Sequence, residues 1–199
     1  MSCTTKTSRR TAVTVAAACL LLAPVAGCGA TDTPDPSVKV ATHAPGTRDE
    51  PKAPAPTRLV VPSLGIDTAL LRLGLNEDGT VEVPPAEKGM TAGWYAGGAV
   101  PGEPGAAVLI GHNDTRFGEA VFHDLHRITK GADIAVSDGS GEEAHFTVTG
   151  TESVSKKAFP TQKVYGATGE RVLRLITCDG AFDAEGHPVD NLIVYAALR

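Results

Sequence analysis

The sequence predicts an all-β fold, and three features of its pattern support this prediction. The chain beyond residue 57 contains seven or eight short runs rich in β-branched and leucine residues. Glycine and proline separate these runs at short intervals, as in chains that turn often between strands. Only one segment has the apolar spacing of a helix. Many short strands with frequent turns are typical of a closed or nearly closed β-barrel.

The first strands are expected between residues 58 and 83. The run TRLVVPSLGIDTAL holds two short apolar stretches, which Pro62 and Gly65 separate. The run NEDGTVEVP then places Asp78-Gly79, a strong hairpin-turn signal, before another short strand. These residues predict three strands joined by tight turns.

Later runs predict the rest of the barrel. The segment AAVLIGHND predicts a buried strand that runs into a loop. The segment DIAVSDGSGEEAHFTVTGT predicts a hairpin, because Ile134 and Val136 alternate on one arm and Phe146 and Val148 on the other. The runs RVLRLITC and NLIVYAAL supply two further strands.

The segment EAVFHDLHRI, residues 119–128, is the one with helical spacing. Val121, Leu125 and Ile128 fall on one side of a helix built over these residues. We therefore expect a short helix in a connection between strands.

The N-terminus predicts export. Lys6, Arg9 and Arg10 precede the apolar run TAVTVAAACLLLAPV, which is shorter than the roughly 20 apolar residues of a membrane-spanning helix. The run ends in VAGC, which resembles a bacterial lipobox, so that cleavage would leave a lipidated Cys28 at the mature N-terminus. The alternatives are an uncleaved signal anchor and cleavage elsewhere. Residues 1–27 are thus a predicted signal peptide, and the expected location is the outer face of the cell membrane.

A change in composition near residue 57 predicts where the folded domain begins. Residues 29–56 hold six of the fourteen prolines and none of the nine aromatic residues. Such a stretch cannot bury enough apolar surface to order itself. Residues 28–56 are therefore predicted to be a disordered linker and residues 57–199 the folded domain.

The charge of the chain bears on its partners. The net charge is −5, and because the first 27 residues carry three basic and no acidic side chains, the remainder sums to −8. A nucleic-acid partner would require a basic surface instead. We therefore expect no nucleic-acid partner.

Cys178 is the only cysteine of the predicted domain. Cys3 and Cys19 lie in the signal peptide, and Cys28 would be acylated. An unpaired thiol in an exported protein indicates an intermolecular disulfide or a reactive group, and a buried, inert cysteine is the alternative. Cys178 ends an apolar strand directly before a DG dipeptide, so we expect it at the rim of the barrel. A thiol becomes a nucleophile only with a histidine, a cation or a helix N-terminus nearby.

Among the six histidines, His112 is the candidate partner for this thiol. It ends the strand AVLIGH and opens a loop, again at a rim, where functional sites are often built. His43 lies in the linker, and His145 is expected to face solvent. His123 and His126 have a metal-binding spacing, but the sequence offers no third ligand, so a solvated helix face is the preferred interpretation. We predict no metal and no other cofactor.

The order and context of these elements resemble the sortase family, and the actinobacterial class F enzymes in particular. The segment PGEPGAAVLIGHND is followed some 65 residues later by LRLITCDGAFD and then DNLIVYA. The likeness extends from LVVPSLGIDTALLRLGLNEDGTVEVP through GWYAGGAVPGEPG to the last strand. It therefore covers nearly the whole predicted domain.

The resemblance implies an eight-stranded sortase barrel and a cysteine transpeptidase. Such enzymes cleave an LPxTG-like sorting signal of a secreted protein between Thr and Gly through a thioester. An amine from a cell-wall precursor or a pilin then accepts the acyl group. On the matching positions, Cys178 is the nucleophile, His112 is the general acid for the leaving amine, and Thr177 helps to line the groove. The alternative is a non-catalytic or weakly active sortase-fold module that binds peptides or wall components.

One position departs from the family pattern. Sortases use an arginine after the cysteine to hold the substrate and the oxyanion, and the position where class F enzymes would carry it is Val189. A missing donor of this kind typically costs roughly 3–4 kcal/mol, or about 10²–10³ in rate. Arg174 shares a strand face with Cys178 and is one substitute, although four residues span about 13 Å and a surface role is preferred. His187 or a backbone N–H of the loop DGAFDAEGHP is another, and a weak or inactive enzyme is the third explanation.

Overall fold

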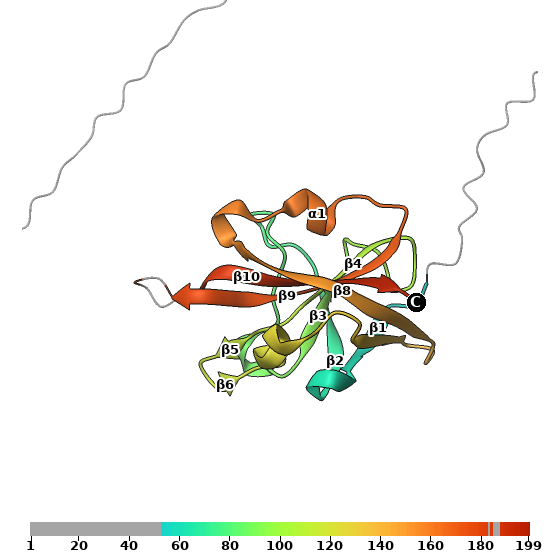
Figure 1. The fold of residues 1–199 in the computed structure, drawn as a ribbon, viewed down its shortest axis with the longest axis horizontal. Helices are drawn as coiled ribbons and strands as arrows, with labels where there is room; N and C mark the ends of the chain where they lie inside the picture. The colour runs from blue at the N-terminus through green and yellow to red at the C-terminus, as the bar shows by residue number, and fades with distance from the viewer. Residues whose placement is uncertain (1–52, 183, 185–187) are drawn as a thin grey trace, which may run out of the picture. The chain divides into compact units, whose positions relative to one another are not determined.

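The structure, a computed structural model, describes residues 53–182, 184 and 188–199 and consists mainly of β-strands (Figure 1). The predicted signal peptide, Cys28, most of the linker and His187 lie outside the described residues. The strands are β1 (Pro56–Val61), β2 (Ile66–Leu73), β3 (Ala92–Tyr95), β4 (Gly105–Ile110), β5 (Asp114–Thr115), β6 (Gly118–Glu119), β7 (Asp133–Asp138), β8 (Glu143–Ser155), β9 (Arg171–Phe182) and β10 (Pro188–Leu198). The helices are η1 (Pro62–Leu64), η2 (Ala86–Lys88), η3 (His123–Arg127), η4 (Lys156–Ala158) and α1 (Thr161–Tyr165). None of the helices in the described part of the chain is long and apolar enough to cross a membrane.

Eight strands close into a barrel in the order β1-β2-β3-β4-β9-β10-β8-β7, which confirms the predicted all-β barrel. The β2–β3 and β4–β9 pairs are parallel, and the other pairs are antiparallel. Parallel neighbours require long crossover connections. The connection after β2 and the one before β9 therefore leave the barrel wall and become available to build a site.

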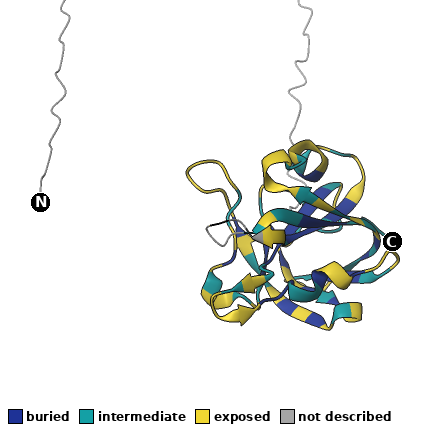
Figure 2. Ribbon diagram, turned by 60° about the vertical axis from the view of Figure 1, so that its left-hand side comes forward, coloured by how far each residue is buried: buried dark blue, intermediate teal, exposed yellow. Residues whose placement is uncertain are grey.

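Alternating apolar residues fill the barrel interior. Leu109, Leu173 and Leu175 are fully buried there, and Trp94 donates a hydrogen bond from Nε1 to the Ala99 carbonyl (3.0 Å). The predicted β7–β8 hairpin is confirmed, and its four alternating apolar residues are all at most 2 % exposed. Burial of one such leucine contributes about 1.5–3 kcal/mol, so this core fixes which face of each strand points inward (Figure 2).

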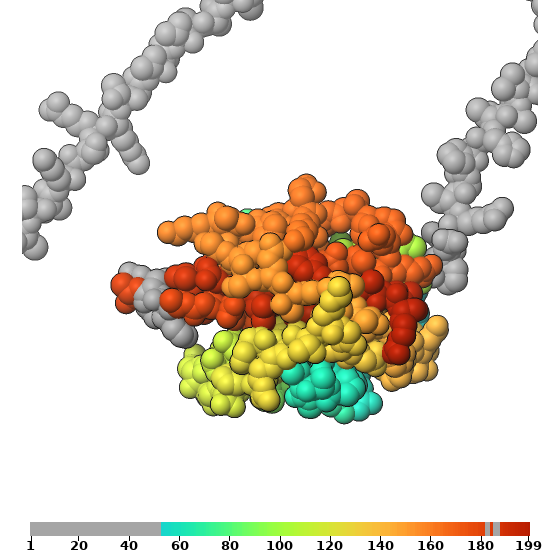
Figure 3. All heavy atoms as spheres, in the orientation of Figure 1, coloured from blue at the N-terminus to red at the C-terminus, as the bar shows by residue number. Residues whose placement is uncertain are grey.

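A second apolar cluster lies on the outside of the barrel wall. It joins six buried side chains from β2, β4, β9, β10 and α1: Leu73, Val108, Ile110, Val164, Ile176 and Ile193. Phe159 and Tyr165 from the connection between β8 and β9 pack against this cluster. Figure 3 shows that connection, in orange, as a layer over the red C-terminal strands. This part of the wall is therefore covered on both faces, and its side chains can line a groove.

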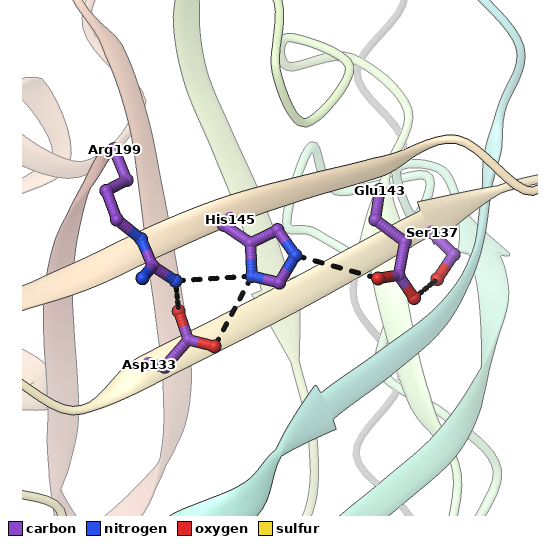
Figure 4. Close-up of polar contacts among 5 residues, drawn as sticks. All are labelled: Asp133, Ser137, Glu143, His145 and Arg199. Atoms are coloured by element: carbon purple, nitrogen blue, oxygen red, sulfur yellow. Dashed lines mark hydrogen bonds and ion pairs between the residues drawn. The ribbon is translucent and has the colours of Figure 1, made fainter.

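A polar network fixes the C-terminus to the β7–β8 hairpin (Figure 4). The Arg199 guanidinium pairs with Asp133, and the backbone N–H of Arg199 donates to the His145 carbonyl (2.9 Å). The His145 ring lies between the carboxylates of Asp133 (3.3 Å) and Glu143 (3.6 Å). His145 is thus partly exposed on the outer surface and pairs with neighbouring carboxylates.

Two local predictions were right only in part. Residues 119–128 do not form an α-helix, because only the five residues of η3 are helical, as a 3-10 turn. Val121, Leu125 and Ile128 are buried as expected, but the backbone hydrogen bonds join residues three apart, from the Leu125 N–H to the Phe122 carbonyl (3.0 Å) and from the Ile128 N–H to the Leu125 carbonyl (3.1 Å). This is the 3-10 pattern. Beyond the Asp78-Gly79 turn, the expected strand is reduced to a single bridge between Leu75 and Val81.

Candidate active site

The parallel β4–β9 ladder positions His112 and Cys178. The last pair of this ladder is Ile110 with Ile176, and the backbone N–H of Gly111 donates to the Ile176 carbonyl (3.1 Å). His112 and Cys178 each follow this pair by two residues, and strand alternation returns the second residue to the same face. Both line one groove on the outer face of the barrel wall. The structure therefore brings together the two residues singled out in the sequence.

The groove has a volume of about 730 Å³. Its floor is formed by β4, β9 and β10, one wall by the β2–β3 connection and the other by η4 and α1. The lining is mostly apolar, and its side chains include Leu75, Val81, Val83, Tyr95, Ile110, Phe159, Tyr165 and Ile176. An apolar groove with a few polar groups is the usual form of a binding site for a small molecule or a peptide segment.

Cys178 is a free, half-buried thiol inside β9 and not at the end of the strand. The strand continues past a bulge, at which the β9–β10 register shifts between Pro188 and Asp190. Gly180 adopts φ 83° there, a left-handed conformation that glycine tolerates best. A Cβ at Gly180 would lie 2.3 Å from Asp190 Oδ2. The thiol thus lies on the outer face of the wall, two residues beyond the last β4–β9 pair, and only the expectation that it ends its strand was wrong.

The His112 ring is held by the β2–β3 connection. Its Nε2 lies 2.6 Å from the carbonyl oxygen of Pro84. A carbonyl can only accept, so Nε2 carries the hydrogen in this contact. Nε2 is therefore the donor in this contact, and it must leave Pro84 before it can donate to a substrate.

Thr177 contributes to the groove, but its hydroxyl is sequestered. The side chain is 4 % exposed, and Oγ1 has no hydrogen-bond partner within the described residues. Its cross-strand neighbour is Leu192, which belongs to the interior core. A buried hydroxyl without a partner typically costs about 1–3 kcal/mol. This orphaned group directly precedes the nucleophile candidate.

Arg174 and Val189 lie away from the groove. Arg174 shares a strand face with Cys178, but its guanidinium lies over the ring of Tyr195 at 4.7 Å and donates to the Leu173 carbonyl (3.1 Å). Burial lowers the pKa of Arg174. The residue lines a separate hollow and not the groove of Cys178. Val189 is 38 % exposed and does not line the groove either.

Tyr165 and Asn191 were missed by the sequence analysis, and both line the groove. Burial raises the pKa of Tyr165 to about 12, so its hydroxyl stays protonated at neutral pH. Its ring contacts Tyr95 edge-on, with 5.8 Å between the centroids. Asn191 lies opposite Cys178 on β10, an assignment that requires the strand register.

The His123 and His126 pair does not assemble a metal site. His123 Nδ1 lies 3.0 Å from Asp114 Oδ1, and His126 Nδ1 lies 3.1 Å from the His123 carbonyl. Across residues 53–182, 184 and 188–199, no three or more potential ligands converge. These histidines take part in local contacts around η3.

Comparisons with known proteins bear on the fold and the family. The Sortase domain model matches residues 59–199. Sortase C-1 from Actinomyces oris has a TM-score of 0.57 and 22% identity, over 72% of this chain and 71% of that chain. Sortase A from Corynebacterium diphtheriae has a TM-score of 0.57 and 19% identity, over 73% of this chain and 61% of that chain. Sortase C2 of Group B Streptococcus Pilus Island 1 has a TM-score of 0.55 and 21% identity, over 72% of this chain and 73% of that chain.

These structural likenesses, at such low identity, show the fold alone. No curated protein sequence matched significantly. None of the three similar structures is named as class F, so that subtype stays a prediction. The family model covers most of the sequence, including both His112 and Cys178. The chain belongs to the sortase family.

Proposed function

We propose that the chain is a cysteine transpeptidase that cleaves an LPxTG-like sorting signal between Thr and Gly. The observation that carries this proposal is the placement of Cys178 and His112 on one apolar groove of a sortase barrel. A free thiol and an imidazole supply the two groups that amide cleavage requires, a nucleophile and a proton donor for the leaving nitrogen.

The reaction proceeds in two transfers. The Cys178 thiolate attacks the Thr carbonyl carbon, and the C–N bond breaks as His112 protonates the departing amine. The thioester left on Cys178 keeps its acyl reactivity. An amine of a cell-wall precursor or a pilin then attacks the thioester carbon and gives up a proton to His112. The C–S bond breaks with its electron pair on sulfur, and the new amide joins the two proteins or the protein and the wall.

The groove suits the proposed substrate. Leu75, Val81 and Val83 line one wall of the groove, and Phe159 and Tyr165 line the other. These surfaces match the apolar Leu and Pro of a sorting signal. The predicted signal peptide and Cys28 would tether the domain to the outer face of the membrane, where exported substrates emerge.

Intact mass spectrometry tests the proposal. The purified protein is incubated with an LPxTG-type peptide, and an adduct with the mass of the peptide's N-terminal part is expected. The adduct should be absent from Cys178→Ala and should disappear when an amine acceptor is added. A folded protein that alkylates at Cys178 yet forms no adduct with any of several sorting-signal variants would refute the proposal.

Val189 favours a second candidate, a sortase-fold module that binds peptides without cleaving them. The residue supplies no hydrogen-bond donor where class F enzymes would carry the arginine. This candidate predicts saturable binding of a sorting peptide, measured by fluorescence anisotropy, with equal affinity for the wild-type protein and Cys178→Ala and with no covalent product.

A further inference from the structure

The groove contains one polar side chain that pairs directly with the nucleophile candidate. Asn191 of β10 is the cross-strand partner of Cys178 of β9, and the next pair on the same face is Ile193 with Ile176. Both isoleucines are buried in the outer apolar cluster, and this fixes the face. Asn191 and Cys178 line the same groove. Directly opposite residues of an antiparallel pair have their Cβ atoms about 4.5–5.5 Å apart.

The covalent geometry then places the Asn191 amide beside the reacting carbon. A carbonyl carbon attacked by Sγ lies two bonds beyond the Cβ of Cys178. The amide nitrogen Nδ2 lies two bonds beyond the Cβ of Asn191, and it offers two N–H donors. The attacked carbonyl carbon and Nδ2 of Asn191 thus lie at similar distances from the backbones of β9 and β10, on residues that are paired across the two strands.

We propose that Asn191 donates a hydrogen bond to the oxyanion that forms when Cys178 attacks a carbonyl group. In that step the thiolate electron pair forms the C–S bond, and the π pair moves to oxygen. When the C=O bond re-forms, the bond to the leaving group breaks and its electron pair leaves with that group. A preorganised amide donor stabilises the transient negative charge without reorganising.

Arg174 and Val189 are less well placed as donors. Arg174 is four ladder pairs away from Cys178, and its guanidinium is stacked on Tyr195. Val189 has no donor, and its side chain lies outside the groove. Within the described residues, Asn191 is the polar side chain on the strand paired with Cys178 that also lines the groove.

This inference deepens the proposed function and rests on its cysteine chemistry, but not on the sorting signal. Its test therefore uses two small reagents in place of a peptide. Acetylation of Cys178 by 4-nitrophenyl acetate passes through an oxyanion, whereas alkylation by iodoacetamide is a displacement at a saturated carbon and does not. Peptide mass spectrometry of the full chain follows the two rates at Cys178 alone. The variants are Asn191→Ala, the isosteric Asn191→Asp and, as a matched control on the same strand, Val189→Ala.

The ratio of the acetylation rate to the alkylation rate is the readout, because a change in thiol pKa or in folding moves both rates together. Removing one oxyanion donor costs enzymes about 10²–10³ in turnover, so we expect the ratio to fall at least about 10-fold in both Asn191 variants. It should stay constant in Val189→Ala. A ratio that is unchanged in the Asn191 variants would overturn the inference.

The same experiment separates this inference from the proposed function. If the wild-type protein forms no adduct with any sorting peptide but its acetylation still depends on Asn191, the donor role stands and the proposed substrate is refuted. If the peptide adduct forms and the ratio does not depend on Asn191, the proposed function stands and the donor role is refuted.

Discussion

Gly180→Ala should destabilise the barrel and misplace the nucleophile candidate. Gly180 has φ 83° at the β-bulge two residues after Cys178. An added Cβ would lie 2.3 Å from Asp190 Oδ2 and 2.9 Å from Asp190 Cβ and Cγ. Real Cβ atoms do not approach other atoms so closely. Rotation of the Asp190 side chain can move Oδ2 and Cγ away, but its Cβ stays close, so the backbones of β9 and β10 must also shift at this point.

Two contributions set the magnitude. A non-glycine residue in the left-handed region costs about 1–2 kcal/mol. Overpacking of a well-filled site adds about 1–3 kcal/mol. Gly141 provides a matched control, because its φ is 87° but no atom lies within 4 Å of its added Cβ. Gly141→Ala should therefore show the backbone cost alone, and Gly180→Ala should show both costs.

Thermal unfolding measures the difference between these variants. Each kcal/mol lowers the Tm by about 2–4 °C for a chain of this size, so Gly180→Ala should melt several degrees below Gly141→Ala. The rate of Cys178 acylation should also fall only in Gly180→Ala. Replacing Asp190 with Ala in the Gly180→Ala background removes two of the three close atoms and should restore part of the Tm. Equal Tm values for the two glycine variants would show that the bulge has no steric constraint.

Three further predictions concern Arg174, Cys28 and His123. Arg174→Gln should lower the Tm, because it removes the stacking on Tyr195, but should leave the acylation rate of the folded protein within about twofold; a loss of acylation at an unchanged Tm would instead indicate a catalytic role. Cys28→Ala should release the protein from membranes or block its maturation, and an unchanged mass and location in fractionated cells would contradict lipidation. Burial alone would lower the pKa of His123, but the hydrogen bond to Asp114 and nearby acidic charges raise it overall. His123→Gln should therefore cost stability below the unfolded-state pKa, near 6.5, and progressively less as the pH rises through the folded-state pKa, which parallel melts at pH 5 and pH 9 would reveal.

The strands could be predicted because their side chains alternate. In the β7–β8 hairpin, apolar residues recur with a period of two, as Ile134 and Val136 on one strand and Phe146 and Val148 on the other. Ile134 and Phe146 are buried opposite each other. Proline and glycine mark where β1 and β2 end and begin. By contrast, the segment 119–128 has a helical spacing of apolar residues, but it begins in β6 and its backbone hydrogen bonds join residues three apart, so only the short 3-10 turn η3 forms.

The site could be predicted only in part. The sequence places His112 and Cys178 after apolar strands, and the parallel β4–β9 pairing then brings these residues to one groove. The role of Asn191 depends on the β9–β10 register, and the bulge at Gly180 adds a residue to one strand that no pattern in the sequence reveals. If the residues of β9 and β10 were paired from the turn that joins them without this bulge, a different residue of β10 would lie opposite Cys178. The groove wall from η4 and α1 likewise depends on long-range packing.

The absence of an arginine at Val189 lowers the expected rate without deciding between the two candidate functions. The loss of one donor is worth about 10²–10³ in rate, and a typical enzyme turns over about 10 times per second. A sortase without this donor would then still turn over about once in 10–100 s, which is fast enough for an acyl adduct to accumulate within minutes. A donor at Asn191 would recover part of this loss, because an amide N–H acts on the same oxyanion, although it lacks the charge of a guanidinium. The presence of a thioester on Cys178 is therefore the observation that separates a transpeptidase from a binding module, and a slow rate by itself is not.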